Sequence, residues 1–131
     1  MPQDSVEVVR RVFEAHDRRD WDGVYSLYAP EIVWEDVDGI WGDWGTARGR
    51  DGIRAAWRRW LGALERPIFT AEDFSEVGDH VLVRLRMSGR GRESGIDVHQ
   101  VIAMVWTVRA GRVTRVRVYR ERGDAVKAAT R

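Results

Sequence analysis

The spacing of apolar side chains predicts three helices in the first half of the chain. Residues 4–18 repeat apolar positions three and four apart, which is the spacing of one helix face, and Asp4 is placed to cap that helix. A short helix is expected before Pro30, because a proline disfavours helical backbone in the residue that precedes it. The helical spacing returns over residues 51–64 and is closed by Pro67.

The other segments alternate apolar and polar positions with a period of two, which is the pattern of half-buried strands. One such strand precedes the third helix and four follow it, over residues 31–36, 68–77, 81–89, 96–108 and 113–121. Short turns between consecutive strands indicate antiparallel neighbours. Residues 37–49 are rich in glycine, and we expect a loop there.

This order of elements predicts an α+β fold. We expect a curved antiparallel sheet wrapped around the three helices, because four long strands leave an internal pocket above three short helices. One domain is expected over residues 1–131. Residues 123–131 are expected to form a short C-terminal tail, helical over 124–129.

The composition fits a globular protein, since 44% of the 131 residues are hydrophobic and 33% are charged. No apolar run approaches the roughly 18 residues that span a bilayer, and no cysteine is present for a disulfide or a thiolate metal site. With no signal-peptide pattern at the first residues, a cytoplasmic location is expected. The net charge of +1 is far from that of a nucleic-acid binder, so we do not expect nucleic acid as a partner. A membrane is not expected as a partner either, since no apolar run is long enough to span one.

Asp36 is the first candidate for chemistry. It alternates in phase with Ile32 and Trp34, so its side chain is predicted to point inward. A carboxyl group among apolar side chains is poorly hydrated, which disfavours its charged form and can prepare it for proton transfer near neutral pH. The alternative is structural: the carboxylate caps a loop backbone or pairs with an arginine.

His16 is the second candidate proton carrier. It lies one turn beyond Phe13 on the inward face of the first helix, and the ordinary pKa of histidine is about 6.5. A contact between His16 and Asp36 would form an acid–base pair. The alternative is a core histidine that satisfies a buried polar group.

One phase of the third long strand is assigned to the pocket. Gln100, Met104 and Trp106 share that phase, and Met87 has the same orientation on the preceding strand. A buried amide needs hydrogen-bond partners, so Gln100 either contacts a ligand or ties down a neighbouring strand.

The opposite phase of that strand is apolar as well. Val101, Ala103 and Val105 would face outward, and such a stripe exposed to water predicts a homodimer through the outer sheet face. Arg84 and Arg115 have the same orientation on neighbouring strands, where they are available to pair with acidic groups across the dimer.

Tryptophans are more frequent than a core of this size requires. Trp34 lies in the first strand, whereas Trp41 and Trp44 lie in the glycine-rich segment. Two indoles on a loop are suited to form a lid by stacking on a ring system. The expected ligand is therefore a small, hydrophobic, cyclic molecule.

The motifs, in this order, resemble the SnoaL-like branch of the NTF2-like superfamily, which includes ketosteroid isomerases and polyketide cyclases. The resemblance spans about residues 4–122 and is carried by Val8–Ala15, Asp20–Val24, Pro30–Asp36, Gly49–Ile53, Val105–Val113 and Val118–Tyr119. It implies a cone-shaped α+β barrel with a mostly apolar pocket, in many members a homodimer.

The resemblance also implies a general base at Asp36, although Val37 replaces the proline that follows the base in the isomerases. The positions of the two oxyanion donors fall at Val12 and near Met104, and neither side chain can donate a hydrogen bond. Because such donors contribute several kcal/mol each, on the order of 3–4, steroid isomerisation by that mechanism is not expected.

Three functions stay open at this point. The first is a cofactor-free isomerase, cyclase or dehydratase with Asp36 as base and His16 or Gln100 as donor. The second is a binding protein that uses the same pocket without chemistry, and the third is an interaction module that uses the arginine face. No metal site is expected, because the three histidines lie far apart in sequence.

Overall fold

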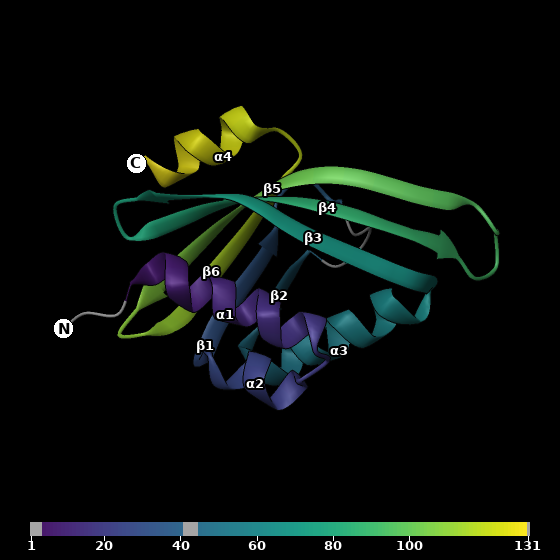
Figure 1. Ribbon diagram of the computed structural model, residues 1–131, viewed down its shortest axis with the longest axis horizontal. Helices are drawn as coiled ribbons and strands as arrows, with labels where there is room; N and C mark the ends of the chain where they lie inside the picture. The colour runs from purple at the N-terminus through teal and green to yellow at the C-terminus, as the bar shows by residue number, and fades with distance from the viewer. Residues whose placement is uncertain (1–3, 41–44, 131) are drawn as a thin grey trace.

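The computed structural model describes residues 4–40 and 45–130, in which helices lie on both faces of a six-stranded sheet (Figure 1). Helices α1 (Ser5–Asp17), α2 (Trp21–Ser26) and α3 (Gly49–Gly62) lie on one face, and α4 (Arg122–Ala129) lies on the other. The strands are β1 (Tyr28–Asp36), β2 (Thr46–Arg48), β3 (Leu64–Val77), β4 (His80–Gly91), β5 (Asp97–Arg109) and β6 (Arg112–Tyr119).

The sheet has the order β2-β1-β6-β5-β4-β3 and is not closed, so β2 and β3 are its edges. This arrangement confirms the predicted α+β fold with a curved sheet around three helices. One pair departs from the expected antiparallel pattern: β1 runs parallel to β6. The prediction rested on short turns between consecutive strands, and no short turn joins these two.

Two irregularities bend the edge strand β3. Its register with β4 shifts twice, and each shift includes a residue in the left-handed region, Arg66 with φ 51° and Asp73 with φ 58°. A bulge of this kind bends the strand and increases its twist. The bend carries β3 around the helical face, where it contacts both α1 and α3.

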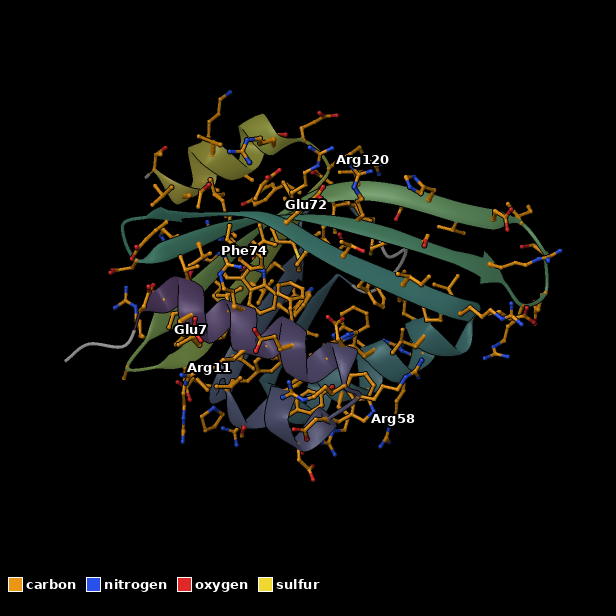
Figure 2. All side chains as sticks on the ribbon, in the orientation of Figure 1. Glu7, Arg11, Arg58, Glu72, Phe74 and Arg120 are labelled. Carbon is orange, nitrogen blue, oxygen red and sulfur yellow. The ribbon has the colours of Figure 1, made fainter. Side chains whose placement is uncertain are left out.

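Helix α1 begins where the sequence predicts, because the side chain of Asp4 accepts a hydrogen bond from the N–H of Val6 at 2.9 Å. Its sheet-facing side chains are buried: Val8, Val9, Val12 and Ala15. Figure 2 shows Phe74 of β3 pointing toward this helix, and its ring lies 6.0 Å from that of Phe13. The helix is thus packed between the inner sheet face and the bent strand.

Helix α4 covers part of the outer sheet face. Ala125 and Ala129 are buried against Leu82, Ala103 and Val105, which form a second apolar cluster. Two of the three positions predicted to face a second subunit are therefore covered by this chain's own helix. The third, Val101, keeps 37% of its surface exposed.

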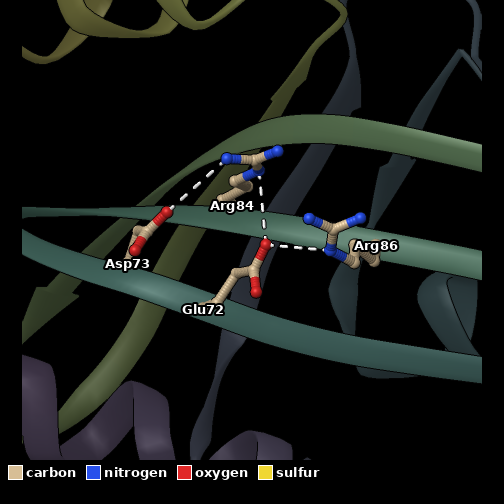
Figure 3. Close-up of polar contacts among 4 residues, drawn as sticks. All are labelled: Glu72, Asp73, Arg84 and Arg86. Carbon is tan, nitrogen blue, oxygen red and sulfur yellow. Dashed lines mark hydrogen bonds and ion pairs between the residues drawn. The ribbon is translucent and has the colours of Figure 1, made fainter.

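The outward-facing arginines pair within the chain. Figure 3 shows the carboxylate of Glu72 between Arg84 and Arg86, with Oε1 at 3.3 Å and 3.0 Å from their Nε atoms. On the same outer face, the Nη2 atom of Arg115 in β6 lies 2.6 Å from the Oε1 atom of Glu35 in β1. These contacts supply the acidic partners that were expected from a second subunit.

Some element ends differ from those expected. Pro30 and Pro67 lie inside β1 and β3, because the preceding helices end earlier, at Ser26 and Gly62. The segment expected to be a loop contains the three-residue strand β2, which pairs with β1. Across the described ranges, no helix combines the length and the apolar character that crossing a membrane requires.

Candidate functional site

A cavity of about 530 Å³ lies between the three helices and the inner face of the sheet. Its wall takes side chains from α1, α2 and α3 and from strands β1, β3, β4 and β5. The aromatic lining residues are Phe13, Trp21, Tyr25, Tyr28, Trp34, Trp57, Phe69 and Trp106. Apart from the tyrosines, the titratable lining residues are His16, Asp22, Arg54 and Arg58.

The tryptophans of the wall pack edge to face. Trp34 lies 5.7 Å from Trp57 and 5.6 Å from Trp106 between ring centres, with interplanar angles of 83° and 80°. Phe69 continues the cluster, 5.8 Å from Trp57. This geometry is favourable for aromatic pairs, so the wall presents firmly packed ring surfaces. The buried Nε1 of Trp106 finds no hydrogen-bond acceptor among the described residues.

His16 lies in an aromatic environment at the end of α1. Its ring is 5.1 Å from Trp21, 5.2 Å from Phe69 and 6.0 Å from Trp57. Desolvation by burial lowers the pKa of His16, an effect that the negative charge of Asp17 opposes. The imidazole is therefore neutral at pH 7, the state in which it can accept a proton.

Tyr25 and Arg54 form the polar part of the wall. The guanidinium carbon of Arg54 lies 4.5 Å from the ring centre of Tyr25. Burial raises the pKa of Tyr25, while the charge of Arg54, its hydrogen bond and the charge of Arg58 act in the opposite direction. Tyr28 lies beside Tyr25 with ring centres 5.6 Å apart, and complete burial raises its pKa strongly. Both phenols are thus neutral hydrogen-bonding groups at pH 7.

Asp36 points inward, as its alternation with Ile32 and Trp34 predicts, and only 6% of its surface is exposed. Its Oδ1 accepts a hydrogen bond from the N–H of Ile40 at 2.9 Å, and its own N–H donates to the carbonyl of Gly45 at 2.8 Å. Asp36 is not among the residues that line the cavity. These two hydrogen bonds indicate a structural role for Asp36 at the end of β1, whereas a role as base stays a prediction.

The other predicted site residues divide into three groups. Trp34, Met104 and Trp106 line the cavity. Met87 and Gln100 lie opposite each other on β4 and β5, Met87 buried and Gln100 half-buried, and neither lines the cavity. Trp41 and Trp44, the predicted lid, lie outside the described residues.

Five polar lining residues were not singled out from the sequence: Asp22, Tyr25, Tyr28, Arg54 and Arg58. A signal for the arginines exists, because Arg54, Trp57, Arg58 and Leu61 follow the spacing of one helix face and all line the cavity. Because arginines are charged, they are expected on the solvated side of a helix. Their positions were therefore not counted with those of Trp57 and Leu61 on the cavity-facing side.

A second hollow of about 300 Å³ adjoins the cavity and shares His16, Trp21, Leu61 and Phe69 with it. Arg19 and Arg92 are among its other lining residues. His16 thus lies at the boundary of the two hollows. No group of three or more histidine, aspartate or glutamate side chains in the described part of the chain is placed to hold a metal ion.

Comparison with solved structures supports the fold. An NTF2-like protein from Burkholderia thailandensis is 24% identical, with a TM-score of 0.82 over 98% of this chain and 99% of its own. TerC, co-crystallized with polyporic acid, is 22% identical, with a TM-score of 0.77 over 95% and 97%. A protein of ketosteroid isomerase-like fold from Catenulispora acidiphila, in complex with trimethylamine, is 21% identical, with a TM-score of 0.72 over 86% and 84%.

The sequence comparisons identify the family of the chain. No curated protein matches the chain. The family model described as the SnoaL-like domain matches residues 9–116, which is most of the sequence. The resemblance inferred from the motifs is confirmed, and the chain belongs to the SnoaL-like domain family.

Proposed function

We propose that the protein binds a small, cyclic, largely hydrophobic molecule in the cavity beneath the sheet. The observation that carries this proposal is the cavity itself, whose 530 Å³ falls within the about 300–1,000 Å³ that ligand pockets occupy. Its wall combines rings packed edge to face with a few polar groups. That combination suits a ring system that packs against Trp57 and Phe69 and makes few hydrogen bonds.

The ligands of two similar structures support a small-molecule site in this fold. TerC was crystallized with polyporic acid, and the Catenulispora protein is in complex with trimethylamine. Since sequence identities of 22% and 21% support the fold alone, neither ligand is carried over. The proposal takes from them only that proteins of this fold can bind a small molecule.

A fluorescence titration with N-phenyl-1-naphthylamine, an uncharged aromatic probe, tests the binding proposal. Phe69→Ala removes a lining ring, and Phe74→Ala removes a half-buried phenylalanine of the same strand that does not line the cavity. We expect Phe69→Ala to cost about 1–2 kcal/mol of probe binding, a roughly 5- to 30-fold weakening. Phe74→Ala should change the affinity less than about threefold.

Failure of the wild-type protein to bind the probe would contradict the proposal. Equal weakening by the two variants would contradict it as well, because the probe would then not distinguish the cavity from the rest of the apolar core.

A second candidate is cofactor-free proton transfer on the bound molecule. The observation that favours it is the position of His16, which lines the cavity and is neutral at pH 7 because its pKa is lowered. In such a reaction the imidazole takes a proton from one carbon of the ligand and returns it at another, so that no other reactant is consumed. The alternative base is Asp36, whose carboxylate is buried next to Ile40.

Hydrogen exchange separates the two bases without knowledge of the natural substrate. The probe is 2-tetralone, a bicyclic ketone with acidic protons beside its carbonyl, incubated in D2O and followed by NMR. With His16 as base, His16→Gln abolishes the acceleration over buffer and Asp36→Asn retains most of it. The reverse pattern would assign the base to Asp36, and no acceleration by the wild-type protein would favour binding without chemistry.

The homodimer through the outer sheet face stays part of the proposal. It now rests on Val101, which remains exposed beside the part that α4 covers. Val101→Glu should convert a dimer to a monomer in light-scattering measurements. A wild-type protein that is monomeric in the same measurements would contradict the proposed homodimer.

A further inference from the structure

We infer that the ligand of the cavity carries an acidic group, which Arg54 and Arg58 bind at the side of the cavity formed by α2 and α3. This inference rests on the proposed function and specifies its ligand class: a cyclic molecule with a carboxylate or a comparably acidic substituent. The two arginines lie four positions apart on α3 and both line the cavity, Arg54 as a half-buried residue and Arg58 as an exposed one at its rim. Side chains four residues apart on a helix are neighbours and can reach the same group.

Neither arginine forms an ion pair with a carboxylate of the described residues. Arginines elsewhere do: Arg11 pairs with Glu7, and Arg115 pairs with Glu35. Arg54 lies over the ring of Tyr25 instead, with its guanidinium carbon 4.5 Å from the ring centre. It is half-buried at this position, so part of its hydration is lost without a compensating negative charge.

The cavity contains one carboxylate of its own, that of Asp22, which also lies in its wall. Because His16 is neutral, the charged lining residues among those described are two arginines and one aspartate, so the wall carries a net positive charge. The balance favours an anionic ligand over an ammonium ion, even though an aromatic wall alone would suit a cation. Arginine is also the side chain whose planar donor pattern matches a carboxylate with two parallel hydrogen bonds.

Figure 2 shows Arg58 at the helical side of the molecule, near α2 and away from the ion pairs of the outer face. The apolar part of a ligand would therefore lie against Trp57 and Phe69, and its acidic group would face α2 and α3. Tyr25 adds a neutral hydroxyl beside Arg54, since burial raises its pKa.

Two fluorescent probes that differ by one acidic group test this inference. The probe 8-anilinonaphthalene-1-sulfonate is the sulfonated relative of N-phenyl-1-naphthylamine, so its extra affinity reports the contribution of the anion. We expect the wild-type protein to bind the sulfonate at least tenfold more tightly. Arg54→Gln and Arg58→Gln should each reduce this preference about three- to tenfold. Because both residues line the cavity, the affinity for the neutral probe should change too, but by less than about threefold.

Arg59→Gln is the matched control, because Arg59 is an exposed arginine of the same helix that does not line the cavity. It removes the same charge and should leave the preference unchanged. Arg54→Lys keeps the charge and loses the planar donor pattern, and we expect it to keep only part of the preference. An affinity for the neutral probe within about threefold of the wild-type value shows in each case that the cavity is intact.

The outcomes separate this inference from the proposed function. The inferred acidic group on the ligand is wrong if the wild-type protein binds both probes equally. It is also wrong if Arg59→Gln lowers the preference for the sulfonated probe as much as Arg54→Gln does. In both cases the cavity remains a binding site. If neither probe binds, the proposed function fails and the inference fails with it. Mutual displacement of the two probes is required, because it shows that they share one site.

Discussion

The Oδ1 atom of Asp36 accepts a hydrogen bond from the backbone N–H of Ile40 at 2.9 Å. The backbone N–H of Asp36 also donates to the carbonyl of Gly45 at 2.8 Å. One residue therefore holds the chain on both sides of residues 41–44. The position with the strongest sequence argument for catalysis has contacts that describe a structural anchor.

Asp36→Ala should lower the free energy of unfolding by about 1–3 kcal/mol, because it leaves the amide of Ile40 without its acceptor in a partly buried place. Asp36→Asn keeps an oxygen at the same position and should cost less. Urea unfolding of the two variants measures the difference. If the two variants lose the same unfolding free energy, the hydrogen bond to Ile40 does not account for the contribution of the Asp36 carboxylate to stability.

The lowered pKa of His16 predicts a pH dependence of stability. The unfolded chain binds a proton to this residue below about pH 6.5, whereas the folded protein resists it because the ring is desolvated. The contribution of His16 is therefore fully present above about pH 6.5 and is lost as the pH falls through that value toward the folded-state pKa.

His80 also has a lowered pKa, caused first by burial and then by the charge of Arg117, so it contributes in the same direction. The difference between wild type and His16→Gln isolates the effect of His16. We expect a smaller loss of unfolding free energy between pH 7 and pH 5 in the variant. NMR titration that placed the pKa of His16 at or above about 6.5 would contradict the desolvated position.

Helix α4 should be an integral part of the folded protein. Ala125 is fully buried against Leu82 and Val105, so Ala125→Asp places a charge in an apolar contact. We expect a loss of about 2–4 kcal/mol in unfolding free energy, and more self-association by light scattering as the sheet face is uncovered. Lys127→Asp changes an exposed position of the same helix and should cost less than about 1 kcal/mol.

The ion pairs of the outer face should contribute little. Glu72 holds Arg84 and Arg86 at the surface, where side-chain entropy and solvent screening offset most of the attraction. Glu72→Gln should cost less than about 1 kcal/mol at low salt, and the cost should disappear in about 1 M NaCl. A larger, salt-independent loss would mean that the carboxylate is needed for the fold of β3.

Much of the fold follows from periodicity. The period-two alternation of Val81, Val83, Leu85 and Met87 predicts both the strand and its buried face, and all four side chains are buried. The parallel pairing of β1 with β6 could not be predicted in this way. It depends on where the sheet places two strands that are far apart in the chain, and alternation within each strand carries no information on that.

The site was harder to predict, because alternation gives the direction of a side chain and not its surroundings. Asp36 and Trp34 both point inward from β1, but only Trp34 lines the cavity, since the strand extends past it toward Ile40. Arg54 and Arg58 show the opposite case. Their charge suggests exposure to solvent, and Arg58 is indeed exposed, but both residues also line the cavity from the edge of the buried face of α3.

A crystal structure of the protein with N-phenyl-1-naphthylamine would show where the ligand binds. We expect the aromatic rings inside the cavity, in contact with Phe69 and Trp57 and beside His16. A probe bound on the outer sheet face near Val101, with the cavity filled by rearranged side chains, would contradict the proposed binding site.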